Sequence, residues 1–129
     1  MNVVITGGSR GIGAAAVARF AARGDRVWFL YEKEHAAADQ VAKATGATPI
    51  CCDVADGEAV KAAFARIPDF DPKACMIVGD SLTSDIQGGI NAGLRTCWVN
   101  LRGYEPRADI VPDYTIGALS ELEALLETL

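Results

Sequence analysis

The sequence has 129 residues, a length that fits one domain with a single hydrophobic core. Its formal net charge of −5 argues against non-specific binding to nucleic acid. No apolar run approaches the roughly 18 residues that a membrane-spanning helix needs. The four cysteines form no C-x-x-C pair and only one histidine is present, which favours reduced cysteines over a metal cluster.

Apolar runs that end in glycine or in charged residues predict six strands, at about residues 3–6, 27–31, 48–52, 75–79, 95–99 and 114–116. Helical patterns between them predict helices at about 11–23, 34–44, 56–67, 84–92 and 120–129. Residues suited to helix ends predict where these helices begin and end: Gly24 and Gly46 as C-terminal caps, Asp56 as an N-cap, and a capping box at 120–123. The stretch 100–112 is predicted to be a surface loop.

This alternation predicts an α/β protein with a doubly wound parallel sheet between two layers of helices, a three-layer α/β/α sandwich. Right-handed crossovers give the strand order 3-2-1-4-5-6, with a switch point between the first and fourth strands. The glycine loop after the first strand and Gly79-Asp80 after the fourth should then line one crevice. We predict a single domain over 1–129, in which a loop at 68–72 joins residues 1–67 to residues 73–129.

The stretch Val3–Gly13, VVITGGSRGIG, predicts a buried strand, a glycine turn and the start of a helix. Gly7 and Gly8 allow a positive φ and a tight exit from the strand. Gly11 leaves room for a phosphate, and Gly13 allows close packing of the helix. The N-terminus of the helix favours an anion, so we predict a cradle for a nucleotide phosphate. The alternative is a tight turn with no ligand.

This stretch resembles the short-chain dehydrogenase/reductase family, whose T-G-x-x-x-G-x-G fingerprint appears as Thr6, Gly7, Gly11 and Gly13. The resemblance covers about residues 1–67 and implies a Rossmann-like fold that binds NAD or NADP. The residues expected to bind the cofactor are Gly7, Ser9, Arg10, Gly11, Ile12, Gly13, Tyr31, Asp53 and Val54.

The cofactor preference implied by the resemblance is mixed. Tyr31 stands where NAD-preferring members carry aspartate, and Glu32 stands where many NADP-preferring members carry arginine. Arg10 and Lys33 favour NADP, whereas Glu32 opposes it. Asp53 with the next residue matches the pair that contacts adenine, but a carboxylate that serves only the turn is an equal alternative.

The later motifs of that family are missing. The N-N-A-G run, the serine and the Y-x-x-x-K pair do not occur, since Tyr104 is followed four residues later by Ala108 and Tyr114 by Ala118. Reductase chemistry would therefore lack its acid.

The second half, about residues 71–129, is similar to another family. The run 78–89, VGDSLTSDIQGG, resembles the fourth motif of haloacid dehalogenase-like phosphatases of the nucleotidase type, and 91–100 extends the match. The resemblance implies that Asp80 and Asp85 help to hold Mg²⁺, here as a vestigial site. The D-x-D nucleophile of that family is missing after the first strand, and the letters recur only at 69–71 in a proline-flanked loop.

We interpret the chain as an engineered chimera of the two families, with a natural but divergent domain as the alternative. The predicted function is a designed scaffold that keeps a partial adenine and pyrophosphate site, binds NADP or NAD weakly and is not an enzyme. The alternatives are a weak Mg²⁺-dependent phosphatase, an NAD(P)-dependent reductase, or no binding at all. We expect a cytoplasmic monomer without a targeting signal, whose partner is a small nucleotide rather than nucleic acid or a membrane.

Overall fold

The computed structural model describes residues 1–53 and 55–129. The chain divides into two compact units, Met1–Pro68 and Asp69–Leu129. The boundary follows Pro68, the first residue of the loop that the sequence suggested as a junction. The continuity of the two units as one domain stays a prediction.

The first unit contains a parallel sheet of three strands, β1 (Asn2–Thr6), β2 (Arg26–Tyr31) and β3 (Thr48–Cys51). β2 lies in the middle and pairs with β1 on one side and β3 on the other. Four consecutive residues of β2, from 27 to 30, are buried, as expected of a strand covered on both faces. The predicted order 3-2-1 is confirmed for this half.

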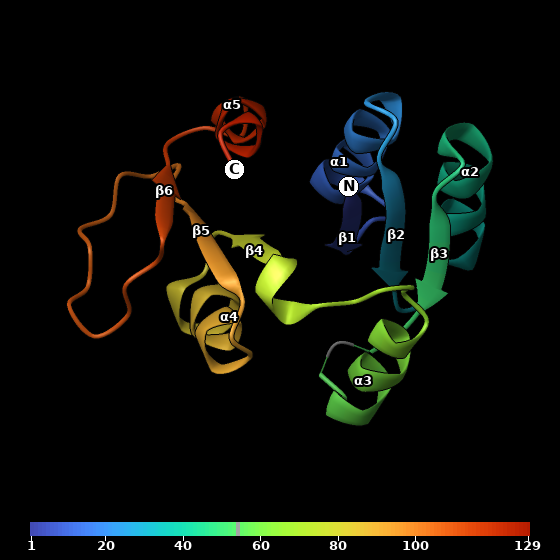
Figure 1. Ribbon diagram of the computed structural model, residues 1–129. Helices are drawn as coiled ribbons and strands as arrows, with labels where there is room; N and C mark the ends of the chain where they lie inside the picture. Colours follow the sequence, from blue (N-terminus) through green and yellow to red (C-terminus); the bar gives the residue numbers. More distant parts are fainter. Residues whose placement is uncertain (54) are drawn as a thin grey trace. The chain divides into compact units, whose positions relative to one another are not determined.

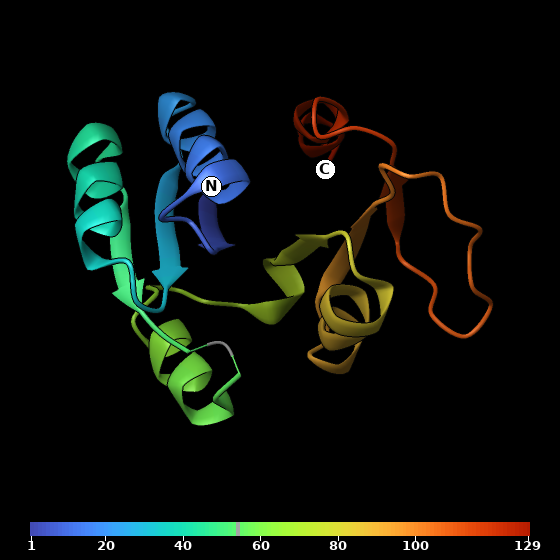
Figure 2. The same ribbon diagram turned by 180° about the vertical axis from the view of Figure 1, so that it is seen from behind.

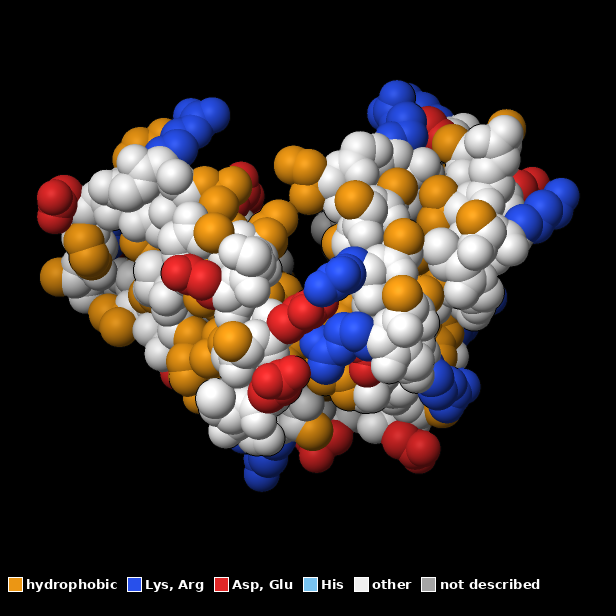
Figure 3. All heavy atoms as spheres, turned by 90° about the horizontal axis from the view of Figure 1, so that it is seen from above, with side chains coloured by type: hydrophobic (Ala, Val, Ile, Leu, Met, Phe, Trp, Pro, Cys, Tyr) orange, Lys and Arg blue, Asp and Glu red, His pale blue; other side chains and the backbone are white. Residues whose placement is uncertain are grey.

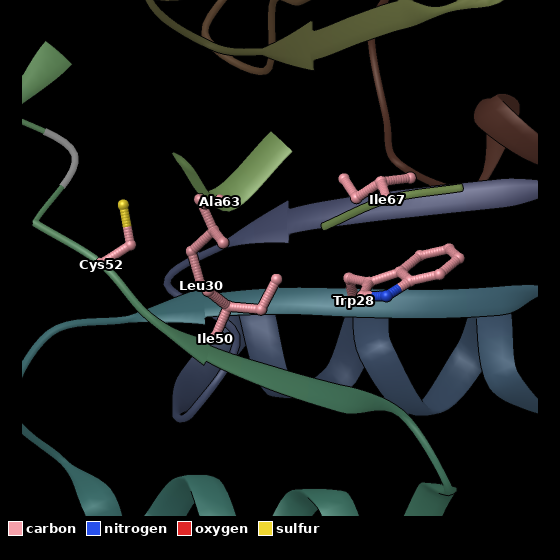
Figure 4. Packing of buried hydrophobic residues seen from close by; sticks show 6 residues of the cluster. All are labelled: Trp28, Leu30, Ile50, Cys52, Ala63 and Ile67. Carbon is pink, nitrogen blue, oxygen red and sulfur yellow. The ribbon is translucent and has the colours of Figure 1, made fainter. Parts of the chain in front are cut away.

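Helices cover both faces of this sheet (Figure 1). α1 (Gly11–Ala22) and α2 (His35–Thr45) pack on the face that carries Val27 and Phe29. α3 (Gly57–Ala65) packs on the opposite face, where it meets Trp28 and Leu30. Figure 4 shows the cluster on the α3 face, formed by Trp28, Leu30, Ile50, Cys52, Ala63 and Ile67.

The helix ends in this unit follow local chemistry. Gly24 and Gly46 have φ angles of 90° and 77°, in the left-handed region where glycine ends a helix without strain. Asp56 is the N-cap of α3, and its carboxylate accepts hydrogen bonds from the backbone N–H groups of Glu58 and Ala59 at 3.1 and 3.4 Å. These three predictions are confirmed.

The second unit contains the parallel strands β4 (Met76–Gly79), β5 (Arg95–Val99) and β6 (Tyr114–Ile116), with β5 in the middle. A short 3₁₀ turn at Pro72–Ala74 precedes β4, and α5 (Glu121–Glu127) follows β6. The long loop after β5 extends away from the strands of this unit, as Figures 1 and 2 show. None of the helices in the described part of the chain has the length and apolarity that a membrane span requires.

Two details of the second unit differ from the sequence-based expectation. The segment after β4 begins as a π-helix at Leu82–Ile86 and only then becomes α4 (Gln87–Asn91). The predicted capping box is wrong, because Ser120 has helical angles (φ −61°, ψ −22°) and its side chain caps nothing. Instead, the carboxylate of Glu121 accepts the N–H groups of Gly117 and Ala118 at 2.6 and 3.2 Å.

The α/β class with parallel strands and covering helices is confirmed. The strand pairs formed by the described residues are β1–β2, β2–β3, β4–β5 and β5–β6, so the orders 3-2-1 and 4-5-6 are each observed. Their union into 3-2-1-4-5-6, and with it the crevice at the switch point, stays a prediction.

Acidic and basic side chains are interspersed over the face drawn in Figure 3.

Candidate functional site

The candidate site of the first unit begins with the turn between β1 and α1. Gly7 and Gly11 have φ angles of 66° and 56°, which a residue with a side chain rarely adopts. A Cβ on Gly13 would overlap the carbonyl oxygen of Gly7, and a Cβ on Gly8 would overlap the ring of Phe29. The turn therefore needs glycine for two reasons, left-handed backbone at two positions and close approach at the other two. For Gly8 the reason is close approach, not the expected positive φ.

The N-terminus of α1 opens directly from this turn. Arg10 is the N-cap residue, its backbone is extended and its side chain makes no capping hydrogen bond. The first turn of the helix contains no acidic residue. Backbone N–H groups at such an end, together with the helix dipole, attract an anion. This geometry suits a phosphate better than a cation.

A cavity of about 400 Å³ lies beside the turn, at the carboxyl ends of the three strands. It is lined by Thr6, Gly7, Ser9, Arg10, Leu30, Glu32, Glu34 and Cys52. In parallel α/β sheets, ligands bind outside this end of the strands. The cavity therefore stands where the fold places a ligand and where the end of α1 favours an anion.

Three of the eight residues that line this cavity are charged. The guanidinium of Arg10 forms an ion pair with the carboxylate of Glu34, with Nη2 and Oε1 2.9 Å apart. Both side chains reach solvent, the Arg10 side chain being 72% exposed and the Glu34 side chain 32%, so this pair contributes little to stability. Glu32 adds a second carboxylate to the same wall.

The structure brings only part of the predicted cofactor set to the cavity. Gly7, Ser9 and Arg10 line it, while Gly11, Ile12 and Gly13 form the adjoining first turn of α1. Ile12 is 74% exposed, so its side chain carries no core packing. The role of each of these residues in binding stays a prediction.

The residues predicted to meet the adenosine end lie differently. The hydroxyl of Tyr31 is 3.0 Å from Nδ1 of His35, and its ring packs with Phe29 on the α1 and α2 face. Burial, followed by the neighbouring Cys51 and Asp39, raises the pKa of the Tyr31 phenol above its usual value.

Asp53 and Val54 were the other two residues expected at that end. Oδ1 of Asp53 accepts the N–H of Ala55 at 2.9 Å, which is the bond expected if this carboxylate serves the turn. Val54 lies outside the described residues.

Sequence reasoning missed four residues of the cavity wall, Thr6, Leu30, Glu34 and Cys52. Strand alternation would have found Leu30, because alternate residues of β2 face opposite sides and Leu30 shares the α3 face with Trp28. Glu34 was expected only as the first residue of a helix. Its contact with Arg10 depends on the path of two side chains, which no sequence pattern specifies.

The second unit holds the predicted metal-binding carboxylates close to the end of β4. Asp80 is exposed, and its carbonyl oxygen accepts the indole N–H of Trp98 at 3.1 Å. Asp85 is half-buried, and its Oδ2 accepts the N–H of Ser81 at 3.2 Å. A Cβ on Gly79 would overlap the Asp85 carboxylate. The absence of a side chain on Gly79 therefore allows the Asp85 side chain to pack against the end of β4.

The donor set at this place is compatible with Mg²⁺ but small. Among residues 1–53 and 55–129, no three or more His, Cys, Asp or Glu side chains are grouped so that they could hold a metal ion. Mg²⁺ prefers oxygen ligands and usually keeps several waters, taking one or two carboxylates and a substrate phosphate besides. Asp80 and Asp85 fit that kind of partial protein shell.

The cysteines take no part in a disulfide. Cys52 and Cys97 are buried, Cys75 is half-buried and Cys51 is exposed. Burial raises the pKa of the Cys52, Cys75 and Cys97 thiols, so they stay protonated and unreactive at neutral pH.

Comparison with protein families gives two matches, each to more than half of the chain. Residues 1–73 match the short chain dehydrogenase family, and residues 52–122 match the HAD-hydrolase-like family. The two matches overlap at residues 52–73.

Three relatives illustrate both matches. The chain is 48% identical over 63 residues to the putative HAD-hydrolase YfnB of Bacillus subtilis, which covers 49% of this chain and 27% of that protein. It is 50% identical over 56 residues to the pyrimidine 5'-nucleotidase YjjG of Escherichia coli, covering 43% and 25%. It is 52% identical over 59 residues to the cyclic-di-GMP-binding biofilm dispersal mediator protein of Escherichia coli, covering 46% and 25%. The chain thus spans about a quarter of the length of these relatives.

Solved structures repeat the pattern. The magnesium-bound structure of YfnB from Bacillus subtilis has a TM-score of 0.64 at 29% identity, covering 88% of this chain and 54% of that one. The structure of BdcA in complex with NADPH has a TM-score of 0.53 at 34% identity, covering 70% and 38%.

These findings correct one prediction. The expectation that the chain is not an enzyme is wrong, because its relatives are named as a HAD-hydrolase and a nucleotidase. The missing D-x-D and Y-x-x-x-K motifs had suggested the opposite, but the matches extend over whole segments of strand and helix. The chain belongs to two enzyme families at once, to the short chain dehydrogenases through residues 1–73 and to the HAD-hydrolase-like proteins through residues 52–122.

Proposed function

We propose that the chain is a chimera in which residues 1–68 bind a nucleotide and residues 69–129 take part in Mg²⁺-dependent hydrolysis of phosphate esters. Two observations support a fusion: the chain divides into two compact units after Pro68, and different families match its two ends, with an overlap at residues 52–73. The nucleotide site lies within the first unit and the carboxylates lie within the second, so each function has its own test.

The nucleotide proposal is carried by one observation, the uncapped N-terminus of α1 beside a cavity at the carboxyl end of the sheet. In this proposal the pyrophosphate lies over Gly7, Ser9, Gly11 and Ile12, where backbone N–H groups and the helix dipole favour it. The adenosine end extends toward the ends of β2 and β3. The related structure with NADPH supports a dinucleotide, and the relative named for cyclic-di-GMP binding adds a second candidate ligand.

Calorimetric titration with ADP, NAD, NADP and cyclic-di-GMP tests this proposal. Gly11→Ala is the informative variant, and Gly24→Ala is its matched control. Both glycines have a positive φ and open space around the added Cβ, so both variants carry a similar backbone strain of about 1–2 kcal/mol. Only Gly11 lies at the N-terminus of α1.

We expect Gly11→Ala to lower nucleotide affinity at least about tenfold, while Gly24→Ala keeps the parent affinity. Equal losses in the two variants would show that strain, rather than the phosphate contact, is responsible. Absence of binding by the parent chain to all four nucleotides would refute the proposal.

The phosphatase proposal is supported by Asp80 and Asp85 near the end of β4 and by the 50% identity to a pyrimidine 5'-nucleotidase over 56 residues. Mg²⁺ bound here would neutralise the charge of a phosphate ester. Asp85, held by the N–H of Ser81, would offer its remaining oxygen as a ligand, and exposed Asp80 would offer its carboxylate. Because the chain carries no D-x-D after a strand, we expect the activity to be weak compared with an enzyme that forms a covalent intermediate.

Hydrolysis of p-nitrophenyl phosphate and of nucleoside 5'-monophosphates, with Mg²⁺ or with EDTA, tests this second function. Asp80→Asn and Asp85→Asn should each lower the Mg²⁺-dependent rate at least about tenfold. Asp109→Asn is the matched control, since Asp109 lies in the exposed loop after β5 and pairs with Arg107. A rate that survives EDTA, or that all three variants share with the parent, would contradict the proposal.

A further inference from the structure

Trp98 is a buried residue of the second unit whose side chain contacts the backbone of a proposed metal ligand. It lies on β5 opposite Gly79, the last residue of β4, and is 3% exposed. Its one polar side-chain group, the indole N–H, donates to the carbonyl oxygen of Asp80 at 3.1 Å. A buried indole N–H needs such an acceptor, because burial without one costs free energy. The pairing of β4 with β5 thus brings Trp98 to the residue that follows β4.

The peptide group between Asp80 and Ser81 connects this hydrogen bond to the second carboxylate. Its carbonyl oxygen accepts the indole N–H of Trp98. Its N–H, which belongs to Ser81, donates to Oδ2 of Asp85 at 3.2 Å. A peptide group is planar, so fixing the direction of its carbonyl also fixes the direction of its N–H. Trp98 therefore acts on the backbone of Asp80 and, through the same peptide group, on the carboxylate of Asp85.

The surroundings of the indole hold its ring in place. Trp98 packs in a buried cluster with Ile86 and Ile110, and Leu82 is partly buried against this cluster. Ile86 directly follows Asp85 at the end of the π-helix, whereas Ile110 comes from the long loop after β5. Close packing of this kind leaves the ring little freedom to turn its N–H away from the Asp80 carbonyl.

We infer that Trp98 is a positioning residue of the proposed Mg²⁺ site: its indole N–H orients the peptide group that follows Asp80 and holds Asp85, and so fixes the direction of both carboxylates. The inference rests on the metal site of the proposed phosphatase function and adds a residue that supplies no ligand atom. Hydrogen-bond partners behind metal ligands commonly change metal affinity by roughly 10–100-fold when they are removed. Loss of this single N–H should therefore weaken Mg²⁺ binding measurably.

Titration of the full chain with Mg²⁺ alone, followed by amide and indole N–H chemical shifts, tests this role without any substrate. The chain contains two tryptophans, and Trp28→Phe assigns their two indole signals. Trp98→Phe is the informative variant, because it keeps an aromatic ring in the cluster and removes the N–H donor. Ile110→Val is its matched control, because it removes one methylene from the same cluster and leaves the hydrogen bond in place.

We expect the indole signal of Trp98 and the amide signal of Ser81 to shift with one dissociation constant, while the indole signal of Trp28 stays unchanged. Trp98→Phe should weaken Mg²⁺ binding about tenfold. Ile110→Val should change the dissociation constant less than about threefold, although thermal unfolding should show that both variants are less stable than the parent.

An Mg²⁺ affinity of Trp98→Phe equal to that of the parent, or a loss that Ile110→Val shares equally, would overturn this inference while leaving the metal site intact. A Trp98 indole signal that does not move while the Ser81 signal shifts would also overturn it, and this measurement on the parent needs no folded Trp98 variant. Absence of Mg²⁺ binding by the parent would overturn both this inference and the proposed phosphatase function.

Discussion

Replacement of Gly13 by alanine perturbs the place where α1 approaches the glycine turn most closely. The added Cβ would overlap the carbonyl oxygen of Gly7, and it would lie 2.7 Å from the carbonyl carbon of Gly7 and 3.1 Å from Cα of Gly8. Ordinary contacts of a Cβ begin at 3.4 Å. Because all three neighbours are backbone atoms, no side-chain rotation relieves the overlap. The turn itself has to move.

The size of the effect follows from two opposing contributions. Overpacking a site costs about 1–3 kcal/mol, and overlap with backbone atoms puts this site at the upper end. Alanine in place of glycine within a helix returns up to about 1 kcal/mol. The expected net loss is therefore about 2 kcal/mol in the free energy of unfolding. For a domain of this size that lowers the melting temperature by roughly 10 °C.

Hydrogen exchange measured on peptides from residues 1–68 gives the stability of the first unit separately. Gly57→Ala is the control, since Gly57 is the first residue of α3 in the same unit and a Cβ there meets no atom within 4 Å. We expect that control to match or slightly exceed the parent. Equal stability of the Gly13→Ala and Gly57→Ala proteins would refute the close packing described for the turn.

Three further predictions concern other parts of the chain. Asp113→Ala leaves the buried N–H and hydroxyl of Thr96 without their acceptor. Hydrogen exchange in residues 69–129 should therefore report a loss of about 2 kcal/mol in the free energy of unfolding. An unchanged free energy would contradict the role of Asp113 as acceptor for Thr96. Cys52 and Cys97 are buried, and burial raises the pKa of their thiols, whereas Cys51 is exposed. At pH 8 iodoacetamide should therefore label Cys51 first, as measured by mass spectrometry. Equal labelling rates of the three cysteines would contradict the described burial. Light scattering should give a monomer, and a concentration-dependent dimer would contradict this.

The strands and their order within each half were accessible from the sequence for a physical reason. A strand covered on both faces is a continuous apolar run, as in β2, and the turns beside it need glycine at left-handed positions such as Gly24. An uninterrupted apolar run does not, however, show which side chains face which helix. Tyr31 packs on the α1 and α2 face, whereas Leu30 lines the cavity. The contact of Tyr31 with a ligand stays a prediction.

The charge arrangement of the site was not accessible from the sequence. Arg10 and Glu34 lie 24 residues apart by their numbers, and their contact depends on how two loops meet. The prediction of a capping box at 120–123 was wrong because Ser120 has helical backbone angles, whereas an N-cap residue has non-helical ones. The prediction that the chain is not an enzyme was wrong for another reason. It was based on individual missing motifs, whereas the family matches extend over whole segments of the chain.

Mapping of amide chemical shifts during titration with NAD tests the central claim most directly, namely that the glycine turn of the first unit binds a nucleotide by its pyrophosphate. The account predicts saturable shifts centred on residues 6–13, with a second group at residues 30–34 where the cavity wall continues. Shifts that avoid residues 6–13, or spectra unchanged at millimolar NAD, would contradict it.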